Sequence, residues 1–331
     1  MLAPALRMFY SIAGRVLLID AEDEWSALAV SKLLARWFLT PLSLPETAPP
    51  DATIKIRCCS NAPPVPEGLI RFEISHGGTG YTDGQTLYLD FNGSVVTIGP
   101  GWTREADVWL TERYDFASEV LAQLISQAFS AVLRRCGLFE LHSGGVVPPK
   151  HGKAVLIAGA SGSGKSTLTL QLTACGWGYL TDDTLLIGEG QQGIEAWGLR
   201  RFFALTADTI AAVRLPQLPA AAEAGLFKKR ITPQDFFPSG QIRSAQPGAI
   251  VFPVITFETE SRVRSLTPSE AMARLLRLCP WACYDKPTAD EHLRTLGRLV
   301  NETVTVDILA GTDLLDDPIR ASDLLIAYAR S

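Results

Sequence analysis

The segment from residue 159 to residue 167 reads Gly-Ala-Ser-Gly-Ser-Gly-Lys-Ser-Thr and meets the spacing G-x-x-x-x-G-K-[ST] of a phosphate-binding loop. In such a loop, glycines let backbone N–H groups converge on phosphate oxygens, and the following helix adds the positive end of its dipole. The lysine reaches the β- and γ-phosphates, and the next hydroxyl joins the magnesium shell. The sequence therefore predicts a nucleotide site formed by Gly159, Ala160, Ser161, Gly162, Ser163, Gly164, Lys165, Ser166 and Thr167.

The residues on either side of this loop have the pattern that it requires. Ala154–Ala158 is a short apolar run typical of a buried parallel strand. After the loop, Leu168, Leu170 and Leu172 indicate a helix that Gly176 can end. A Gly/Ser turn that fits the pattern by chance would not need this context, so we interpret the segment as a nucleotide site.

Two adjacent carboxylates follow this helix. Asp182 and Asp183 come directly after the apolar stretch that starts at Gly178. In an open parallel sheet, the carboxyl ends of neighbouring strands meet at the ligand crevice, so we expect the pair to face the loop. One carboxylate can bind Mg²⁺, and the other can take a proton from an attacking hydroxyl. Adjacent aspartates also occur in plain turns, and their position one strand–helix unit after the loop favours the functional interpretation.

These motifs, together with Glu140-Leu141-His142-Ser143-Gly144-Gly145-Val146 before the loop, resemble the catalytic domain of HPr kinase/phosphorylase. More closely, they resemble HPr-kinase-related proteins found outside sugar-uptake control. The resemblance covers roughly residues 138–260. It implies an α/β, P-loop-containing domain with a mixed sheet related to PEP carboxykinase. It also implies an ATP-dependent kinase that uses Mg²⁺ to transfer the γ-phosphate to a serine or threonine hydroxyl.

The resemblance further implies roles for individual residues. Asp182 would be the catalytic base, and Asp183 would be a metal-site carboxylate beside the Ser166 hydroxyl. Glu195, in a Glu-Ala-Trp-Gly-Leu stretch similar to the family's Glu-x-x-Gly-Leu, would assist the magnesium. His142 would lie near the γ-phosphate, and a leucine-flanked histidine suits a core position equally well.

Lys228-Lys229-Arg230 is a basic cluster after a stretch expected to be a surface loop. Family members often hold a basic residue near the nucleotide, which implies that Arg230, and less strongly Arg243, stabilises charge on the transferred phosphoryl group. A solvated loop is the favoured interpretation for the two lysines. The Pro-Gly-Arg-Asn signature of true HPr kinases is not evident, and Pro247-Gly248-Ala249-Ile250 is its nearest trace. We therefore predict a related kinase rather than a true HPr kinase, with a Ser or Thr hydroxyl of a protein or peptide as the expected acceptor and a small metabolite as the alternative.

A second class of function uses the same loop. A P-loop ATPase or nucleotide-dependent switch would turn over ATP without a phosphoryl acceptor. Its distant Walker B strand ending in Asp-Glu and its Ser-Gly-Gly-Gln signature are not evident here. A non-catalytic module derived from a kinase is disfavoured, because Lys165, Ser166 and both aspartates are intact.

The chain is expected to divide near residue 138. Residues 1–137 are predicted to form a smaller, β-rich α+β domain that recognises substrate or a partner, with a strongly amphipathic helix over 115–136. Residues 138–331 form the predicted kinase domain. The glycine-rich stretch 77–80 lacks a lysine and a following helix, so it is interpreted as a flexible turn.

The composition argues against several other classes of protein. A chain of 331 residues with 47% hydrophobic residues suits a globular protein with two cores, and a net charge of −5 argues against nucleic acid as an obligate partner. No apolar run approaches the ~20 residues needed to span a bilayer. No signal peptide is evident, and Met8 is an alternative start. The six cysteines form no C-x-x-C pair, so reduced thiols and a cytoplasmic location are expected. A homo-oligomer stays open, since related kinases are often oligomeric.

Overall fold

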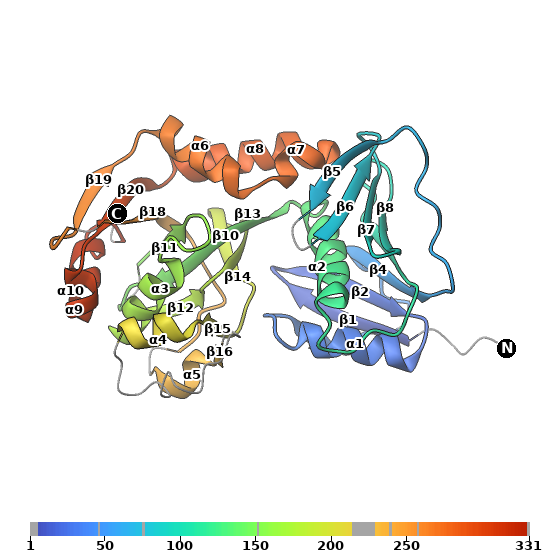
Figure 1. The fold of residues 1–331 in the computed structure, drawn as a ribbon, viewed down its shortest axis with the longest axis horizontal. Coiled ribbons are helices and arrows are strands. Elements are labelled where there is room, and N and C mark those ends of the chain that lie inside the picture. The colour runs from blue at the N-terminus through green and yellow to red at the C-terminus, as the bar shows by residue number, and fades with distance from the viewer. Residues whose placement is uncertain are drawn as a thin grey trace. The chain divides into compact units, whose positions relative to one another are not determined.

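The computed structural model describes residues 6–329 apart from 46, 75–76, 151, 214–228, 238–239 and 257. The chain forms two compact units (Figure 1). The first contains residues 1–139 and 281–293, and the second contains 140–280 and 294–331. Helix α8 (Lys286–Asn301) therefore contributes residues to both units. The division drawn from the sequence at residue 137 does not include this late segment of the first unit.

The first unit is built on a mixed sheet with the strand order β3-β1-β2-β4-β9-β8-β7-β6-β5. Its strands are β1 (Leu6–Ile12), β2 (Arg15–Ala21), β3 (Thr40–Leu42), β4 (Ala52–Cys58), β5 (Ile70–Ile74), β6 (Gly78–Thr82), β7 (Leu87–Phe91), β8 (Ser94–Ile98) and β9 (Glu105–Leu110). Its helices are α1 (Glu24–Leu34), α2 (Glu119–Arg134), α7 (Trp281–Tyr284) and the first part of α8. Helix α2 is the predicted amphipathic helix, and its apolar face packs on β8 and β9.

The expectation of a flexible turn at residues 77–80 is wrong, because Gly78 begins strand β6. The strand pairs with β5 and β7. A Cβ at Gly78 would collide with the ring of Phe91, and a Cβ at Gly80 would collide with the ring of Phe72. The glycines are therefore places where neighbouring aromatic rings lie directly over the strand.

A buried ion cluster ties the late segment to the rest of the first unit. The Asp285 carboxylate accepts hydrogen bonds from Arg134 Nε at 2.8 Å and from Arg135 Nη1 at 2.9 Å, and all three side chains are buried. Burial opposes ionisation of Asp285, but the two guanidinium charges outweigh it and hold the pKa of this carboxyl below its usual value. Losing one partner of such a buried group typically costs about 3–5 kcal/mol.

The second unit is a mixed α/β layer structure, as expected. Its main sheet has the order β17-β14-β13-β10-β11-β18-β20-β19, with β12 beside β10, and β15 pairs separately with β16. The strands are β10 (Leu138–Val147), β11 (Ala154–Ala158), β12 (Gly178–Thr181), β13 (Thr184–Gly190), β14 (Gly193–Gly198), β15 (Phe203–Leu205), β16 (Lys229–Ile231), β17 (Ser244–Ala245), β18 (Pro247–Ile255), β19 (Arg262–Ser265) and β20 (Val304–Ala310). The helices are α3 (Lys165–Ala174), α4 (Ala207–Val213), α5 (Pro233–Phe236), α6 (Pro268–Leu278), the end of α8, α9 (Asp313–Asp316) and α10 (Pro318–Leu325).

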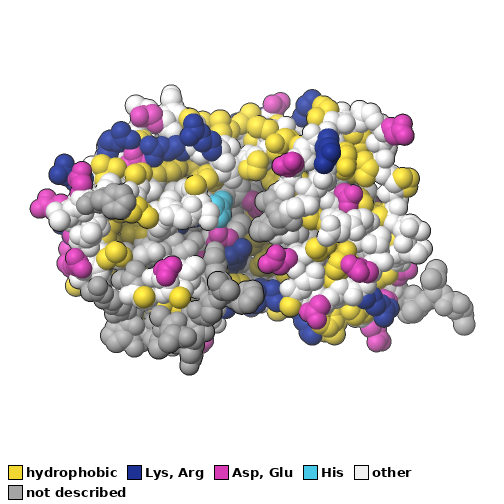
Figure 2. Space-filling model, viewed as in Figure 1, with side chains coloured by type: hydrophobic (Ala, Val, Ile, Leu, Met, Phe, Trp, Pro, Cys, Tyr) yellow, Lys and Arg dark blue, Asp and Glu magenta, His cyan; other side chains and the backbone are white. Residues whose placement is uncertain are grey.

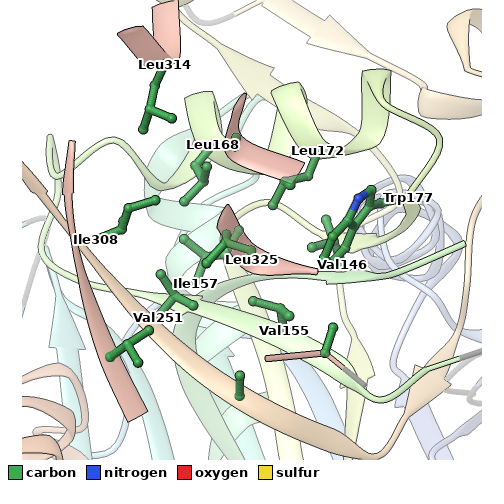
Figure 3. Close-up of a cluster of buried hydrophobic side chains, with 14 residues drawn as sticks. Val146, Val155, Ile157, Leu168, Leu172, Trp177, Val251, Ile308, Leu314 and Leu325 are labelled. Carbon is green, nitrogen blue, oxygen red and sulfur yellow. The ribbon is translucent and has the colours of Figure 1, made fainter. Parts of the chain in front are cut away.

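Helix α3 lies at the centre of this unit, because both of its faces are buried. Leu168 and Leu172 pack against Val155 and Ile157 of β11 and against Leu325 of α10 (Figure 3). Leu170 belongs to a separate cluster formed with β12, β15, β16 and α4. The spacing of these leucines thus places apolar side chains on opposite faces of one helix, which fixes the helix firmly behind the glycine-rich loop.

Basic side chains gather over α6 and β19 of the second unit (Figure 2). Arg264 and Arg274 from these elements pair with the buried carboxylate of Asp307, and Arg262 pairs with Glu258. This group of charges is therefore largely neutralised within the unit. Among the described residues, no helix is both long and apolar enough to cross a membrane.

Candidate active site

The glycine-rich loop, residues 159–164, joins β11 to α3, and residues 165–167 of the motif form the first turn of the helix. Gly162 has φ 82° and Gly164 has φ 96°, in the left-handed region that favours glycine. Gly164 is the N-cap of α3, and no side chain caps this helix start in the described structure. The first N–H groups of the helix are therefore available to an anionic ligand.

The Lys165 side chain folds back over the loop. Its Nζ donates to the carbonyl oxygens of Gly159 at 2.8 Å and Ala160 at 2.9 Å, and the residue is only 6% exposed. The hydroxyl oxygen of Ser163 is buried without a hydrogen-bond partner in the part of the chain that the structure describes. Ser166 lies half-buried in the first helical turn. The loop thus presents one cation and several polar groups around the helix start.

Strand β10 lies between β11 and β12 and is antiparallel to both. The sequence suggested that the strand before the loop and the strand before the Asp pair are direct neighbours, and this detail is wrong. Ser143 pairs with Ala158, and Gly145 pairs with Thr181. Because one antiparallel strand separates them, β11 and β12 still end at the same edge of the sheet.

Gly144 shows how closely the helix approaches the Asp pair. A Cβ on this residue would collide with Thr169 Oγ1 of α3 and would lie 3.5 Å from the carbonyl oxygens of Thr181 and Asp182. Thr169 in turn donates to the Lys165 carbonyl at 2.8 Å. The second turn of α3 and the start of the Asp pair therefore flank a single glycine.

The Asp182 side chain is buried, with 1% exposure. Its Oδ2 accepts from the Ala204 N–H at 3.0 Å, and its Oδ1 lies 3.3 Å from the Tyr179 hydroxyl. Burial raises the pKa of Asp182 to about 6, and the neighbouring Asp183 adds to the rise, although the Ala204 N–H and the Arg200 charge oppose it. This carboxyl group therefore titrates near neutrality.

Asp183 is the more accessible carboxylate of the pair. Its Oδ2 accepts from Arg200 Nη2 at 2.8 Å, and its Oδ1 lies 3.4 Å from His142 Nδ1. The side chains of His142 and Asp183 are 37% and 21% exposed. His142 is thus at the site edge and is not a core histidine. Arg200 was missed from the sequence, although it directly follows the Glu-x-x-Gly-Leu stretch.

The strand register places the backbone of Arg230 next to this group, and the residue is exposed. Arg230 pairs with Ala204 in the β15–β16 ladder, and the Ala204 N–H binds Asp182. Its guanidinium lies 5.1 Å from the centre of the Phe202 ring. Arg243 is exposed. Burial lowers the pKa of Arg201, and the positive charge of Arg243 adds to this effect. Lys228 lies outside the described residues.

Glu195 is not brought to the Asp pair, which corrects its expected place at the metal. It pairs with Gly188 across the β13–β14 hairpin, and its side chain lies against Gly190 at the hairpin end. Asp183 precedes Thr184 at the other end of β13, so about 13 Å of strand separates Thr184 from Gly188. The hairpin register therefore keeps Glu195 apart from Asp183.

We expect Gly198→Ala to destabilise the protein by about 3 kcal/mol. A Cβ at Gly198 would collide with the carbonyl oxygen of Leu180, and backbone atoms cannot rotate away as a side chain can. Chemical denaturation measures the change, and Gly297→Ala in α8 is the control. A Cβ at Gly297 meets nothing within 4 Å, so that change should be neutral or stabilising. Equal stabilities of the two variants would contradict the close approach of β12 and β14.

The chain was compared with protein-family models, curated proteins and solved structures. No protein-family model matches the chain, and no curated protein matches it. Among solved structures, the chain is similar to the Hpr(Ser) kinase/phosphatase from Coxiella burnetii, at 13% identity and a TM-score of 0.30. The match covers 57% of this chain and 98% of that chain. A similarity this low assigns neither a fold family nor a function to the chain.

Proposed function

We propose that the protein is an ATP-dependent kinase that transfers the γ-phosphate to a hydroxyl of a protein or peptide. The observation that carries the proposal is the common sheet edge of the glycine-rich loop, His142 and the Asp182–Asp183 pair. A phosphate cradle and a proton acceptor are the two parts that phosphoryl transfer requires at one place.

The residues at this edge fit a magnesium ion. Mg²⁺ usually takes one or two protein ligands and completes its shell with phosphates and water. Asp183 supplies an accessible carboxylate, and Ser166 supplies a hydroxyl in the first turn of α3. Among the described residues no cluster of three or more His, Cys, Asp or Glu forms a ready-made site, which suits a metal that arrives with its nucleotide. Bound there, the ion would neutralise charge on the phosphates.

The other residues of the site have separate roles in phosphoryl transfer. Lys165 and the loop N–H groups orient the β- and γ-phosphates, and Arg230 adds positive charge beside the site. The bond between the γ-phosphorus and the bridging β-phosphate oxygen breaks, ADP leaves with that oxygen, and the γ-phosphorus forms a bond to the acceptor oxygen. The acceptor proton passes to Asp182, whose pKa of about 6 leaves it ionised at neutral pH.

The test is incubation of the purified protein with ATP labelled in the γ-phosphate, Mg²⁺ and candidate protein or peptide acceptors, including products of neighbouring genes. Label on a serine or threonine hydroxyl is the expected result. Release of phosphate at the same rate with and without every acceptor would favour the P-loop ATPase or switch. Absence of nucleotide binding would contradict both functions.

We expect Arg200→Ala to move the pH dependence of transfer towards alkaline pH. The positive charge of Arg200 lowers the pKa of Asp182, so its removal lets that pKa rise further above its usual range. The rate should then reach its plateau at a higher pH than in the wild type. Arg277→Ala, at an exposed position of α6, is the control. If the pH dependence of transfer in Arg200→Ala is the same as in the wild type, Asp182 is not the group that accepts the proton.

A further inference from the structure

A pocket of about 370 Å³ lies beside the glycine-rich loop, wholly within the second unit. One wall is the face of α3 that carries Thr167, Leu168 and Gln171. The facing wall is formed by the ends of β18 and β20 and by α9. Ligand pockets in proteins commonly enclose about 300–1,000 Å³, so a small organic group fits.

The pocket adjoins the part of the loop and of α3 where the phosphates would bind. Thr167 directly follows Lys165 and Ser166 in the first turn of α3, and it lines the pocket together with Ser163 and Gly164 of the loop. Gln171 lies one helical turn further along the same face. A molecule whose phosphates rest on the loop can therefore extend along α3 directly into this space.

The far wall of the pocket is aliphatic. It carries Pro253 and Ile255 of β18, Ile308 and Ala310 of β20, and Leu315 of α9. Leu168 of α3 and Ile308 of β20 belong both to the pocket lining and to the core of the unit, and both are labelled in Figure 3. Flat aromatic rings are well accommodated between such side chains, because they bury a large apolar area.

Several polar side chains that line the pocket already form hydrogen bonds within the protein. The Gln171 amide donates to the Leu314 carbonyl, and the Thr256 hydroxyl donates to the Ala310 carbonyl at 3.0 Å. The Thr209 hydroxyl is paired with Thr206 at 3.0 Å. Strands β18 and β20 therefore offer few side chains that could read the hydrogen-bonding edge of a ligand. The exposed Asp208 of α4 and the Ser163 hydroxyl of the loop are polar groups of the lining that lie outside these strands.

We propose that this pocket holds the base and ribose of a nucleoside triphosphate and recognises the base by apolar contact rather than through its edge. The inference rests on the proposed nucleotide-dependent function and adds the part of the site that the loop sequence does not specify. Because the contacts are apolar, adenine and guanine nucleotides should bind with affinities within about tenfold of each other.

The experiment compares equilibrium binding of ATP, GTP and inorganic tripolyphosphate in the presence of Mg²⁺. The wild type should bind ATP at least tenfold more tightly than tripolyphosphate, since only ATP fills the pocket. Ala310→Phe, which fills the pocket, should weaken ATP binding at least tenfold and leave tripolyphosphate binding within twofold. Leu315→Asp, at a partly exposed position of the lining, should act in the same direction if Ala310→Phe does not fold.

Ile319→Asp is the matched control, because Ile319 is exposed on α10 and does not line the pocket. Equal effects of Leu315→Asp and Ile319→Asp on ATP binding would overturn the proposal. So would equal affinities of the wild type for ATP and tripolyphosphate, a purine preference above tenfold, or variants that lose transfer to an acceptor while binding ATP normally. If the wild type binds neither ATP nor tripolyphosphate, the proposed function itself fails.

Discussion

Lys165→Ala is expected to lower the rate of phosphoryl transfer by about 10²–10³-fold. The ammonium group lies within 3 Å of two loop carbonyls, at 2.8 and 2.9 Å, so it is held on the loop that would bind the β- and γ-phosphates. Its removal takes away the charge that offsets the phosphates and two contacts that shape the loop. Single-turnover transfer of label from ATP measures the loss.

Lys153→Ala is the control for this variant, because Lys153 is exposed just before β11. It should transfer phosphate at the wild-type rate. Thermal unfolding of both variants shows whether the loop change disturbs the fold. Transfer by Lys165→Ala within tenfold of the wild type would contradict the role of this side chain.

Asp182→Asn is expected to retain nucleotide binding and to lower transfer by about 10²–10⁴-fold, the usual contribution of a general base. The amide has the shape of the carboxyl group, so the packing around it is kept. Its oxygen can still accept from the Ala204 N–H, and its NH₂ can donate to the Tyr179 oxygen, whose own hydrogen reaches the Phe202 carbonyl at 2.9 Å. The variant thus resembles the protonated aspartic acid.

The pH dependence of the wild type tests the same residue. With a pKa of about 6, Asp182 gains its negative charge as the pH rises, so transfer should increase through pH 6 and level off above it. The pKa of Asp182 is higher in the folded state than in the unfolded chain, so between about pH 4 and 6 the folded state binds the proton more strongly. The free energy of unfolding should therefore fall as the pH rises from about 4 to 6. Asp182→Asn should lack this contribution. A wild-type rate of transfer in Asp182→Asn would contradict the role of Asp182 as the base. So would a wild-type transfer rate that does not change through pH 6.

Local pattern was enough for the parts of the site that lie on one segment. Strand β11 and the loop follow from an apolar run and a spacing of glycines, and α3 ends at Ala174, two residues before the Gly176 that was expected to end it. The insertion of β10 between β11 and β12 could not be predicted in this way. Its pairing joins residues that are far apart in the chain, and no local periodicity specifies strand order.

The surroundings of the two aspartates were missed for a related reason. Tyr179 lies on β12 itself, and its hydroxyl contacts both Asp182 and the Phe202 carbonyl just before β15. Arg200 reaches Asp183 from the segment after β14. For Glu195 the sequence predicted a contact that the structure does not have. The short Glu-x-x-Gly-Leu similarity placed Glu195 at the metal, but the β13–β14 register keeps it apart from Asp183. Side-chain partners depend on tertiary contacts that the sequence pattern does not encode.

The buried pairing of Arg135 with Asp285 has a consequence for biosynthesis. The two residues are separated by 150 positions, so at ribosomal rates of about 5–20 residues per second the carboxylate follows the arginine by roughly 8–30 s. During that interval the nascent first unit holds two guanidinium groups without their counter-charge. It cannot reach its final packing until nearly the whole polypeptide has emerged, so the second unit must be largely translated before the first is complete.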